Sequence, residues 1–194
     1  SVYVMRIHDV LQTSGFGDPI QKFLSFQDGE QVVSVISLDP RLLPVGRDPH
    51  LVAATTGGLV VRSPLKPHLE RSTKTGRRLV RLEAGDQVVG AACAVKGTKT
   101  ILLVTNKGRA ARLKLEQVPA RSGSSKGKQS LALQKGEQLV SATLAETVTL
   151  ETTRGAEEAL VAKKVRLADL GGDPQVIKQR GGYKRALTPA PELV

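Results

Sequence analysis

Three glycine-containing loops carry side chains suited to binding an anion. Their sequences are RSTKTGRR (71–78), RSGSSKGK (121–128) and KQRGGYKR (178–185). Counted back from the turn that follows each loop, Gly76, Gly127 and Gly181 occupy one position. A glycine lets the backbone approach a phosphate without a Cβ in the way, and Lys or Arg beside exposed backbone N–H groups suits phosphate oxygens. Such contacts hold a nucleic-acid backbone and carry little sequence information.

Basic residues on neighbouring segments extend this surface. Arg62 and Arg112 stand fifty residues apart in two similar phrases, and Arg81 is expected to point outward between Val80 and Leu82. The full set that we expect to contact phosphate is Arg62, Arg71, Lys74, Arg77, Arg78, Arg81, Arg109, Arg112, Lys114, Arg121, Lys126, Lys128, Arg180, Lys184 and Arg185.

The formal net charge of +11 is concentrated in the middle of the chain. Residues 62–128 hold 16 Lys or Arg against 4 Asp or Glu, whereas residues 1–61 hold 4 against 6 and residues 129–194 hold 9 against 8. A concentrated basic block is typical of a surface that binds a polyanion. A surface that binds nucleic acid is therefore favoured over a basic surface that serves only solubility.

The aromatic content favours duplex over single-stranded nucleic acid. The chain has two Tyr, three Phe and no Trp, and none of them lies in the basic block. Single-strand binders and sheet-type RNA readers stack bases on aromatic rings, whereas a duplex backbone requires only charge and shape. With roughly six to eight phosphates contacted, log K should fall against log salt with a slope of about −5 to −7.

Other kinds of site are weakly supported. His8, His50 and His68 have no metal-ligand spacing, and the only cysteine, Cys93, is expected to be a buried thiol. GFGDPI (15–20) lacks the third glycine and the helix of a dinucleotide-binding loop. No nucleophile–base arrangement is visible, so we expect no catalytic residue, metal or cofactor within this chain.

The compartment is expected to be the cytoplasm, without a membrane partner. One cysteine cannot form a disulfide framework, and the sequence shows neither a secretory signal nor a run of about 18 apolar residues.

Two phrases recur at intervals of about fifty residues. The first is a glycine turn followed by an apolar run, and it occurs in QDGEQVVSVI (27–36), EAGDQVVGAA (83–92) and QKGEQLVSAT (134–143). A fourth, degenerate copy is TPAPELV (188–194), in which Ala190 replaces the glycine. The second is a hairpin phrase, in AATTGGLVVR (53–62), LVTNKGRAAR (103–112) and LETTRGAEEA (150–159). In the first repeat the hairpin glycine would fall just before Ser1, so we expect the sequence to begin directly after a hairpin turn.

Each repeat is expected to form four short β-strands. In the third repeat, ILLVT (101–105) and RAARLKL (109–115) flank the turn NKG. Four strands in about fifty residues, without a helical period, is the size of a propeller blade, and an ordinary sandwich of short strands is the alternative. We therefore predict an all-β fold in a single repeat domain, 1–194, with repeats at about 1–50, 51–100, 101–146 and 147–194.

The order of apolar strand, Thr-x-x-Gly hairpin, charged strand, basic glycine loop and Gly-Glu turn resembles the C-terminal domain of bacterial type IIA topoisomerase A subunits. TNKGRAARLKLEQVP (105–119) is the best match and SGFGDPIQKFLSFQDGEQVVSV (14–35) the second. The resemblance implies a β-pinwheel, a propeller-like ring whose blades exchange a strand. It also implies that duplex DNA binds on the basic rim and is bent or wrapped. The family has five or six blades, so four repeats imply an open or broken ring.

The resemblance further implies partners outside this chain. Strand cleavage belongs to an N-terminal domain of the same subunit, and the ATPase subunit completes a heterotetramer. The parent enzyme is thus expected to use ATP and Mg, although no residue of this chain is expected to bind them. KQRGGYKR matches the gyrase signature box, Gln-Arg-Arg-Gly-Gly-Lys-Gly, only at Gln179, Arg180, Gly181 and Gly182. This partial match favours topoisomerase IV, with gyrase as the alternative.

Charge placement predicts that DNA crosses mainly over the second and third blades. The first and fourth repeats have Val4 and Ala159 where the other two have Arg62 and Arg112. A propeller-like scaffold whose basic face meets an acidic protein is an alternative function, and a stand-alone enzyme is a third class that no motif supports.

Overall fold

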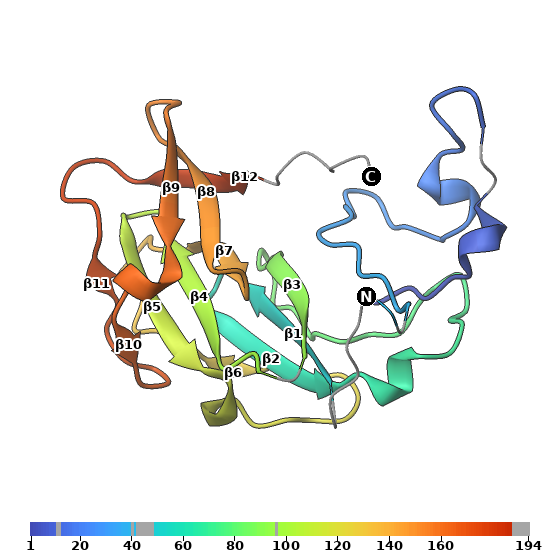
Figure 1. Ribbon diagram of the computed structural model, residues 1–194, viewed down its shortest axis with the longest axis horizontal. Helices are drawn as coiled ribbons and strands as arrows, with labels where there is room; N and C mark the ends of the chain where they lie inside the picture. The colour runs from blue at the N-terminus through green and yellow to red at the C-terminus, as the bar shows by residue number, and fades with distance from the viewer. Residues whose placement is uncertain (11–12, 40, 42–48, 96, 188–194) are drawn as a thin grey trace.

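Short β-strands and single 3-10 turns make up the architecture in Figure 1. The computed structural model describes residues 1–10, 13–39, 41, 49–95 and 97–187. The strands are β1 (His50–Thr55), β2 (Leu59–Pro64), β3 (Val88–Ala94), β4 (Thr100–Thr105), β5 (Arg109–Lys114), β6 (Lys128–Gln129), β7 (Leu139–Thr143), β8 (Thr147–Thr152), β9 (Glu157–Val161), β10 (Leu167–Ala168), β11 (Gln175–Val176) and β12 (Tyr183–Leu187). The 3-10 helices are η1 (Ile7–Asp9), η2 (Ile20–Lys22), η3 (Lys66–His68), η4 (Leu115–Gln117) and η5 (Ala162–Lys164). In the described part of the chain, these three-residue helices are too short to cross a membrane.

Three consecutive repeats are each centred on one mainly antiparallel sheet. Blade 2 has the strand order β3-β1-β2-β6, and blade 3 has the order β10-β5-β4-β7 with β11 also paired to β5. Blade 4 has the order β12-β8-β9. The sheets follow one another around an arc that does not close (Figure 1). This arrangement confirms the predicted all-β, propeller-like fold with an open ring.

The Thr-x-x-Gly phrase closes the hairpin of each sheet. Gly58 donates its N–H to the Thr55 carbonyl at 2.9 Å, and Gly108 donates to the Thr105 carbonyl at 3.2 Å. Both glycines have positive φ, 84° and 70°, which glycine adopts at little cost. The Thr hydroxyl then accepts the N–H four residues on, as Thr105 Oγ1 does from Arg109 at 3.3 Å. These two bonds explain why Thr and Gly recur at this spacing.

In each repeat, one segment pairs with the hairpin strand of the preceding repeat. β6, from the third repeat, pairs with β2 through Lys128 and Val60. β10 and β11, from the fourth repeat, both pair with β5. In the second repeat, Arg77 holds the matching position and bridges to Val2 of the first. Neighbouring repeats therefore exchange a strand, as the resemblance implied.

Hydrophobic cores lie between successive blades. Leu51 and Ala53 of β1 belong to the core shared with the first repeat, whereas Val52 and Ala54 belong to the core shared with blade 3. A third core lies between blades 3 and 4. Because both faces of the inner strands are buried, those strands read as continuous apolar runs.

The first repeat departs from this pattern. Residues 1–4 hold the place of β2 and residues 31–36 that of β3, but no counterpart of β1 occurs among the described residues. Val35 of this repeat is consequently 88% exposed. The predicted fourth copy of the turn phrase, 188–194 with Ala190, lies outside the described residues.

The strand exchange can be tested at Gly127. Its φ is +89°, and an added Cβ would lie 2.8 Å from the carbonyl oxygen of Val60 on the neighbouring hairpin. Gly123, in the same loop, has φ +76° and open space around it. We expect Gly123→Ala to cost about 1 kcal/mol of unfolding free energy from backbone strain alone. Gly127→Ala should cost at least about 2 kcal/mol, because the edge strand must also shift.

Denaturant unfolding of the two variants measures the difference. Equal costs for Gly123→Ala and Gly127→Ala would show that the packing of this loop on β2 contributes nothing to stability.

Candidate nucleic-acid interface

Three loops lie along the outer edge of the blades, at equivalent positions. We call residues 72–77, 121–128 and 168–175 the edge loops. Each begins at an equivalent residue of the hairpin strand: Ser72 donates its N–H to the Val4 carbonyl, and Arg121 donates to the Arg62 carbonyl, both at 2.9 Å. Each ends opposite the residue two positions earlier on that strand. The backbone between these anchors bows away from the sheet.

Edge loops 121–128 and 168–175 also form backbone hydrogen bonds to the segment that directly follows the previous edge loop in the sequence. Ser125 donates its N–H to the Leu79 carbonyl at 3.1 Å and accepts the N–H of Arg81 at 2.9 Å. Gly172 accepts the N–H of Ala132 at 2.9 Å in the same way. The loops therefore form one continuous edge.

The basic loops of the second and third repeats lie one blade earlier than expected. Loop 72–77 lies against residues of the first repeat, and loop 121–128 lies on the hairpin of blade 2. The strand exchange carries each loop to the preceding blade. The path of DNA over the blades stays a prediction.

Arg62 and Arg112 hold neighbouring repeats together. Arg62 Nη1 donates to the Leu115 carbonyl at 2.6 Å, and Arg112 Nε donates to the Val165 carbonyl at 2.7 Å. Both side chains are half-buried. Arg62 Nε is buried and has no hydrogen-bond partner among the described residues. It borders a recess of about 30 Å³ under edge loop 121–128. These two arginines therefore brace the edge, and the buried Nε of Arg62 remains without a partner among the described residues.

Arg77 braces its own loop. Its guanidinium donates to the carbonyls of Glu70 and Arg71 at 2.7 and 3.1 Å. Nearby His68 is 5% exposed, and burial, together with the charge of Arg77, lowers the pKa of its imidazole.

Arg109 forms an ion pair in the interior. Its side chain is 11% exposed, and it contacts the fully buried carboxylate of Glu137, with Nε 2.9 Å from Oε1. Glu137 also accepts the hydroxyl of Thr105 at 2.7 Å and the N–H of Gln134 at 2.9 Å. Burial alone would raise the pKa of Glu137, but these hydrogen bonds outweigh it and lower that pKa to about 2. Arg109 thus has a partner other than phosphate.

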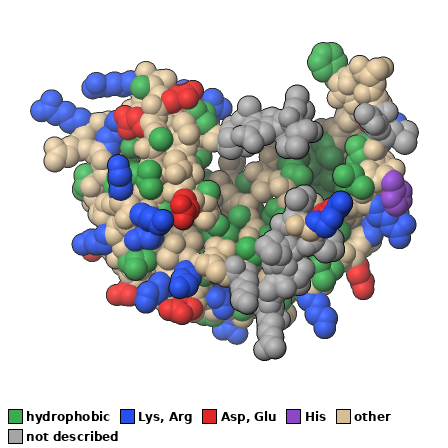
Figure 2. All heavy atoms as spheres, in the orientation of Figure 1, with side chains coloured by type: hydrophobic (Ala, Val, Ile, Leu, Met, Phe, Trp, Pro, Cys, Tyr) green, Lys and Arg blue, Asp and Glu red, His purple; other side chains and the backbone are tan. Residues whose placement is uncertain are grey.

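The remaining predicted cations are exposed and fall into two groups. The first group has carboxylate partners: Arg71 with Asp9 at 3.3 Å, Lys114 with Glu116 at 3.9 Å, Lys126 with Glu83 at 2.5 Å, and Lys184 and Arg185 with Glu151 at 3.1 and 2.7 Å. The second group has no ion pair within the described ranges and comprises Lys74, Arg78, Arg81, Arg121, Lys128 and Arg180. On the face in Figure 2, Lys and Arg side chains line the lower and left margins. Five of the six cations in the second group lie on or beside the first two edge loops.

KQRGGYKR occupies a different position from the one predicted. Tyr183 donates its N–H to the Asn106 carbonyl at 3.1 Å where β12 begins, as Leu139 donates to the Thr56 carbonyl at 2.9 Å where β7 begins. Residues 178–182 of the octet are therefore the turn before β12 of blade 4, the counterpart of QKGEQ (134–138), and Tyr183, Lys184 and Arg185 begin β12 itself. Tyr183 itself is buried, and burial together with Glu158 raises its pKa to about 12.

The prediction that Gly181 matches Gly76 and Gly127 is consequently wrong. Pro174 holds their position, directly before Gln175 on β5. Counting back from Ala190 failed because KQRGG (178–182) is itself the turn before β12, so the count should start there. Tyr183 follows Gln175 by eight positions, whereas Leu139 follows Lys128 by eleven.

Sequence reasoning also missed a basic turn near Arg180. Lys107 donates to the carbonyl of Lys135 at 2.8 Å, and Arg154 lies in the next hairpin turn. Lys107, Lys135, Arg154 and Arg180 are all exposed. These residues all lie in Thr-x-x-Gly or Gly-Glu turns, and that shared position could have identified them from the sequence. The fourth repeat could be aligned for this purpose only with the hydrogen-bond register of the structure.

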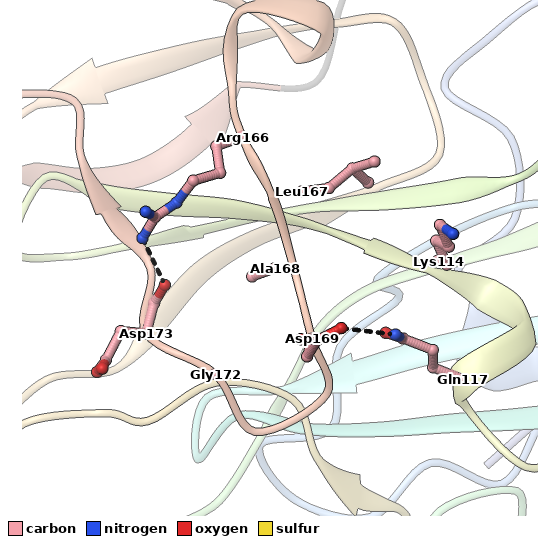
Figure 3. Close-up of a pocket in the computed structure, with 8 residues that line it drawn as sticks. All are labelled: Lys114, Gln117, Arg166, Leu167, Ala168, Asp169, Gly172 and Asp173. Carbon is pink, nitrogen blue, oxygen red and sulfur yellow. Dashed lines mark hydrogen bonds between the residues drawn. The ribbon is translucent and has the colours of Figure 1, made fainter.

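A recess of about 330 Å³ lies under the third edge loop (Figure 3). Lys114, Gln117, Arg166, Asp169 and Asp173 supply its polar groups. In the described part of the chain no group of three His, Cys, Asp or Glu could hold a metal ion. Cys93, predicted to be buried, is half-buried, and burial raises the pKa of its thiol.

Comparison with known proteins gives consistent matches. The family model described as the DNA gyrase C-terminal domain, a beta-propeller, matches residues 49–94 and 99–146. The gyrase A protein of Kosmotoga olearia is 26% identical over 156 residues, which cover 80% of this chain and 19% of that protein. This chain therefore spans about a fifth of the curated relative that it matches.

Solved structures share the fold. The C-terminal domain of DNA topoisomerase IV has a TM-score of 0.75 at 19% identity, covering 88% of this chain and 54% of that one. The DNA gyrase A C-terminal domain has a TM-score of 0.67 at 16% identity, covering 89% and 58%. The E. coli ParC C-terminal domain has a TM-score of 0.63 at 17% identity, covering 92% and 73%.

The Arg109–Glu137 pair predicts a specific pH dependence. A carboxyl whose pKa falls from 4.5 unfolded to about 2 folded stabilises the fold above pH 4.5 and loses that contribution as pH falls toward 2. The contribution at neutral pH is about 3 kcal/mol. We expect Glu137→Gln to unfold more easily at pH 7 and the two unfolding curves to converge between pH 4.5 and 2. Parallel curves over this range would contradict the pairing.

Proposed function

We propose that this chain, which belongs to the family of DNA gyrase C-terminal β-propeller domains found in type IIA topoisomerase A subunits, binds and bends duplex DNA. One observation carries the proposal. Edge loops 72–77 and 121–128 are hydrogen-bonded into a continuous outer edge that holds exposed cations without carboxylate partners among the described residues.

The chemistry of this edge suits a phosphate backbone. Lys74, Arg78, Arg81, Arg121 and Lys128 are exposed on or beside the two loops. Duplex DNA carries one negative charge per ~1.7 Å of its axis, so a row of cations can release several counterions. Contacts from these side chains to phosphate oxygens read no base sequence. The proposed contact is therefore independent of sequence.

The proposed DNA track runs over the edges of the first two blades. The loops lie on neighbouring blades of an arc, and in this proposal the duplex follows the arc and bends. Bending a site of about 20–30 base pairs costs roughly 1–6 kcal/mol, which the added phosphate contacts offset.

The role in a whole protein is part of the same proposal. The chain would be an accessory domain that presents DNA to the cleavage domain of its own polypeptide, in an enzyme that uses ATP and Mg through its ATPase partner. Such an enzyme acts at the nucleoid. The preference for topoisomerase IV over gyrase stays a prediction, since the matched names include both enzymes.

A salt series with linear duplex DNA tests the electrostatic footprint. With roughly six phosphates contacted, log K should fall against log salt with a slope of about −5. A slope shallower than about −2 would overturn the proposed footprint, and binding to an acidic protein without binding to DNA would support the scaffold alternative.

Charge reversal locates the contact. We expect Arg121→Glu with Lys128→Glu to weaken DNA binding at least about 100-fold at low salt, because two attractive contacts become repulsive. Lys163→Glu with Lys164→Glu changes the net charge equally on η5, away from edge loops 72–77 and 121–128, and serves as the matched control. Equal losses in both double variants, measured by gel shift, would show that only net charge matters.

A further inference from the structure

The three edge loops differ in charge at one structural position. Their charged residues are Lys74 and Arg77 in the first, Arg121, Lys126 and Lys128 in the second, and Asp169 and Asp173 in the third. The loops are equivalent because each ends on the same residue of a hairpin strand: Arg77 on Val2, Lys128 on Val60, and Gln175 on Ala110. Two cationic loops are thus followed by an anionic one.

The anionic loop is the next one along the same edge. Gly172 bridges to Leu131 in parallel, as Ser125 bridges to Val80 one blade earlier. A duplex that follows the edge past loop 121–128 would therefore meet loop 168–175.

The two carboxylates have no cationic partner in the described part of the chain. Asp169 Oδ1 accepts a hydrogen bond from the neutral amide of Gln117 at 3.0 Å. Arg166 donates at 3.4 Å to the backbone carbonyl of Asp173 and not to its carboxylate (Figure 3). Lys114, across the recess, lies 3.9 Å from Glu116. Neither aspartate forms an ion pair within the described ranges.

We propose that Asp169 and Asp173 set the end of the DNA footprint, an inference that rests on the proposed function. At this position a phosphate meets carboxylates in place of cations, so continued contact would bring like charges together without releasing counterions. DNA leaves the edge before blade 3, and the charge of one loop limits the arc over which the duplex is bent.

The experiment changes this loop in the chain of 194 residues. Asp169→Lys with Asp173→Lys is compared with Asp28→Lys with Glu146→Lys, which changes the net charge equally off the edge. Affinity is measured against a series of duplexes of increasing length and against salt. For the edge variant we expect the length at which affinity stops rising to increase, and the salt slope to steepen by about 2.

Asp173→Lys alone is a second variant, because its carboxylate makes no hydrogen bond in the described part of the chain. It should steepen the slope by about 1 without loss of the fold. The inference is overturned if the edge variants match the off-edge control in both length and slope while the unmodified protein binds with a steep slope. If the unmodified protein does not bind duplex DNA, the proposed function itself fails.

Discussion

The hydrogen bonds between each hairpin strand and a segment of the following repeat determine the rest of this structure. An uncovered sheet edge exposes unpaired N–H and C=O groups, and here β2 and β5 are covered by β6, β10 and β11 from the next repeat. The segments that do the covering must leave the sheet between their two anchors, which produces the bowed edge loops. The surface proposed for DNA is therefore a by-product of completing the sheets.

The basic residues of this chain divide between two tasks that composition does not distinguish. Arg62 and Arg112 donate to carbonyls of the next repeat, and Arg109 neutralises a buried carboxylate. Lys and Arg on the edge loops remain in solvent. Arginine suits the first task because its planar guanidinium can satisfy a carbonyl while its stem packs between blades. Part of the concentrated positive charge of residues 62–128 thus stabilises the fold.

Local chemistry was predictable from the sequence, and long-range register was not. The Thr-x-x-Gly turn fixes a hairpin through bonds spanning three or four residues, so β4, β5 and the blade architecture followed directly from it. The glycines of KQRGGYKR were assigned to the wrong position because the octet contains the turn before β12, and its sequence differs from the other two Gly-Glu turns. The spacing from Gln175 is also three positions shorter than in the third repeat. The pairing of Arg109 with Glu137 was also invisible, since it joins residues 28 apart through the tertiary fold.

The double anchoring of the edge loops has a mechanical consequence. Loop 121–128 is bonded both to β2 and to residues 79–81, so a pull on its side chains loads two separate segments of the preceding repeat at once. A bent duplex acts as a spring that presses outward against whatever holds it. The force that a bent duplex exerts on the edge loops would be transmitted along the strands. Several backbone hydrogen bonds would share this force, so that no single bond carries all of it. The rim can therefore resist a stiff polymer although no single blade is large.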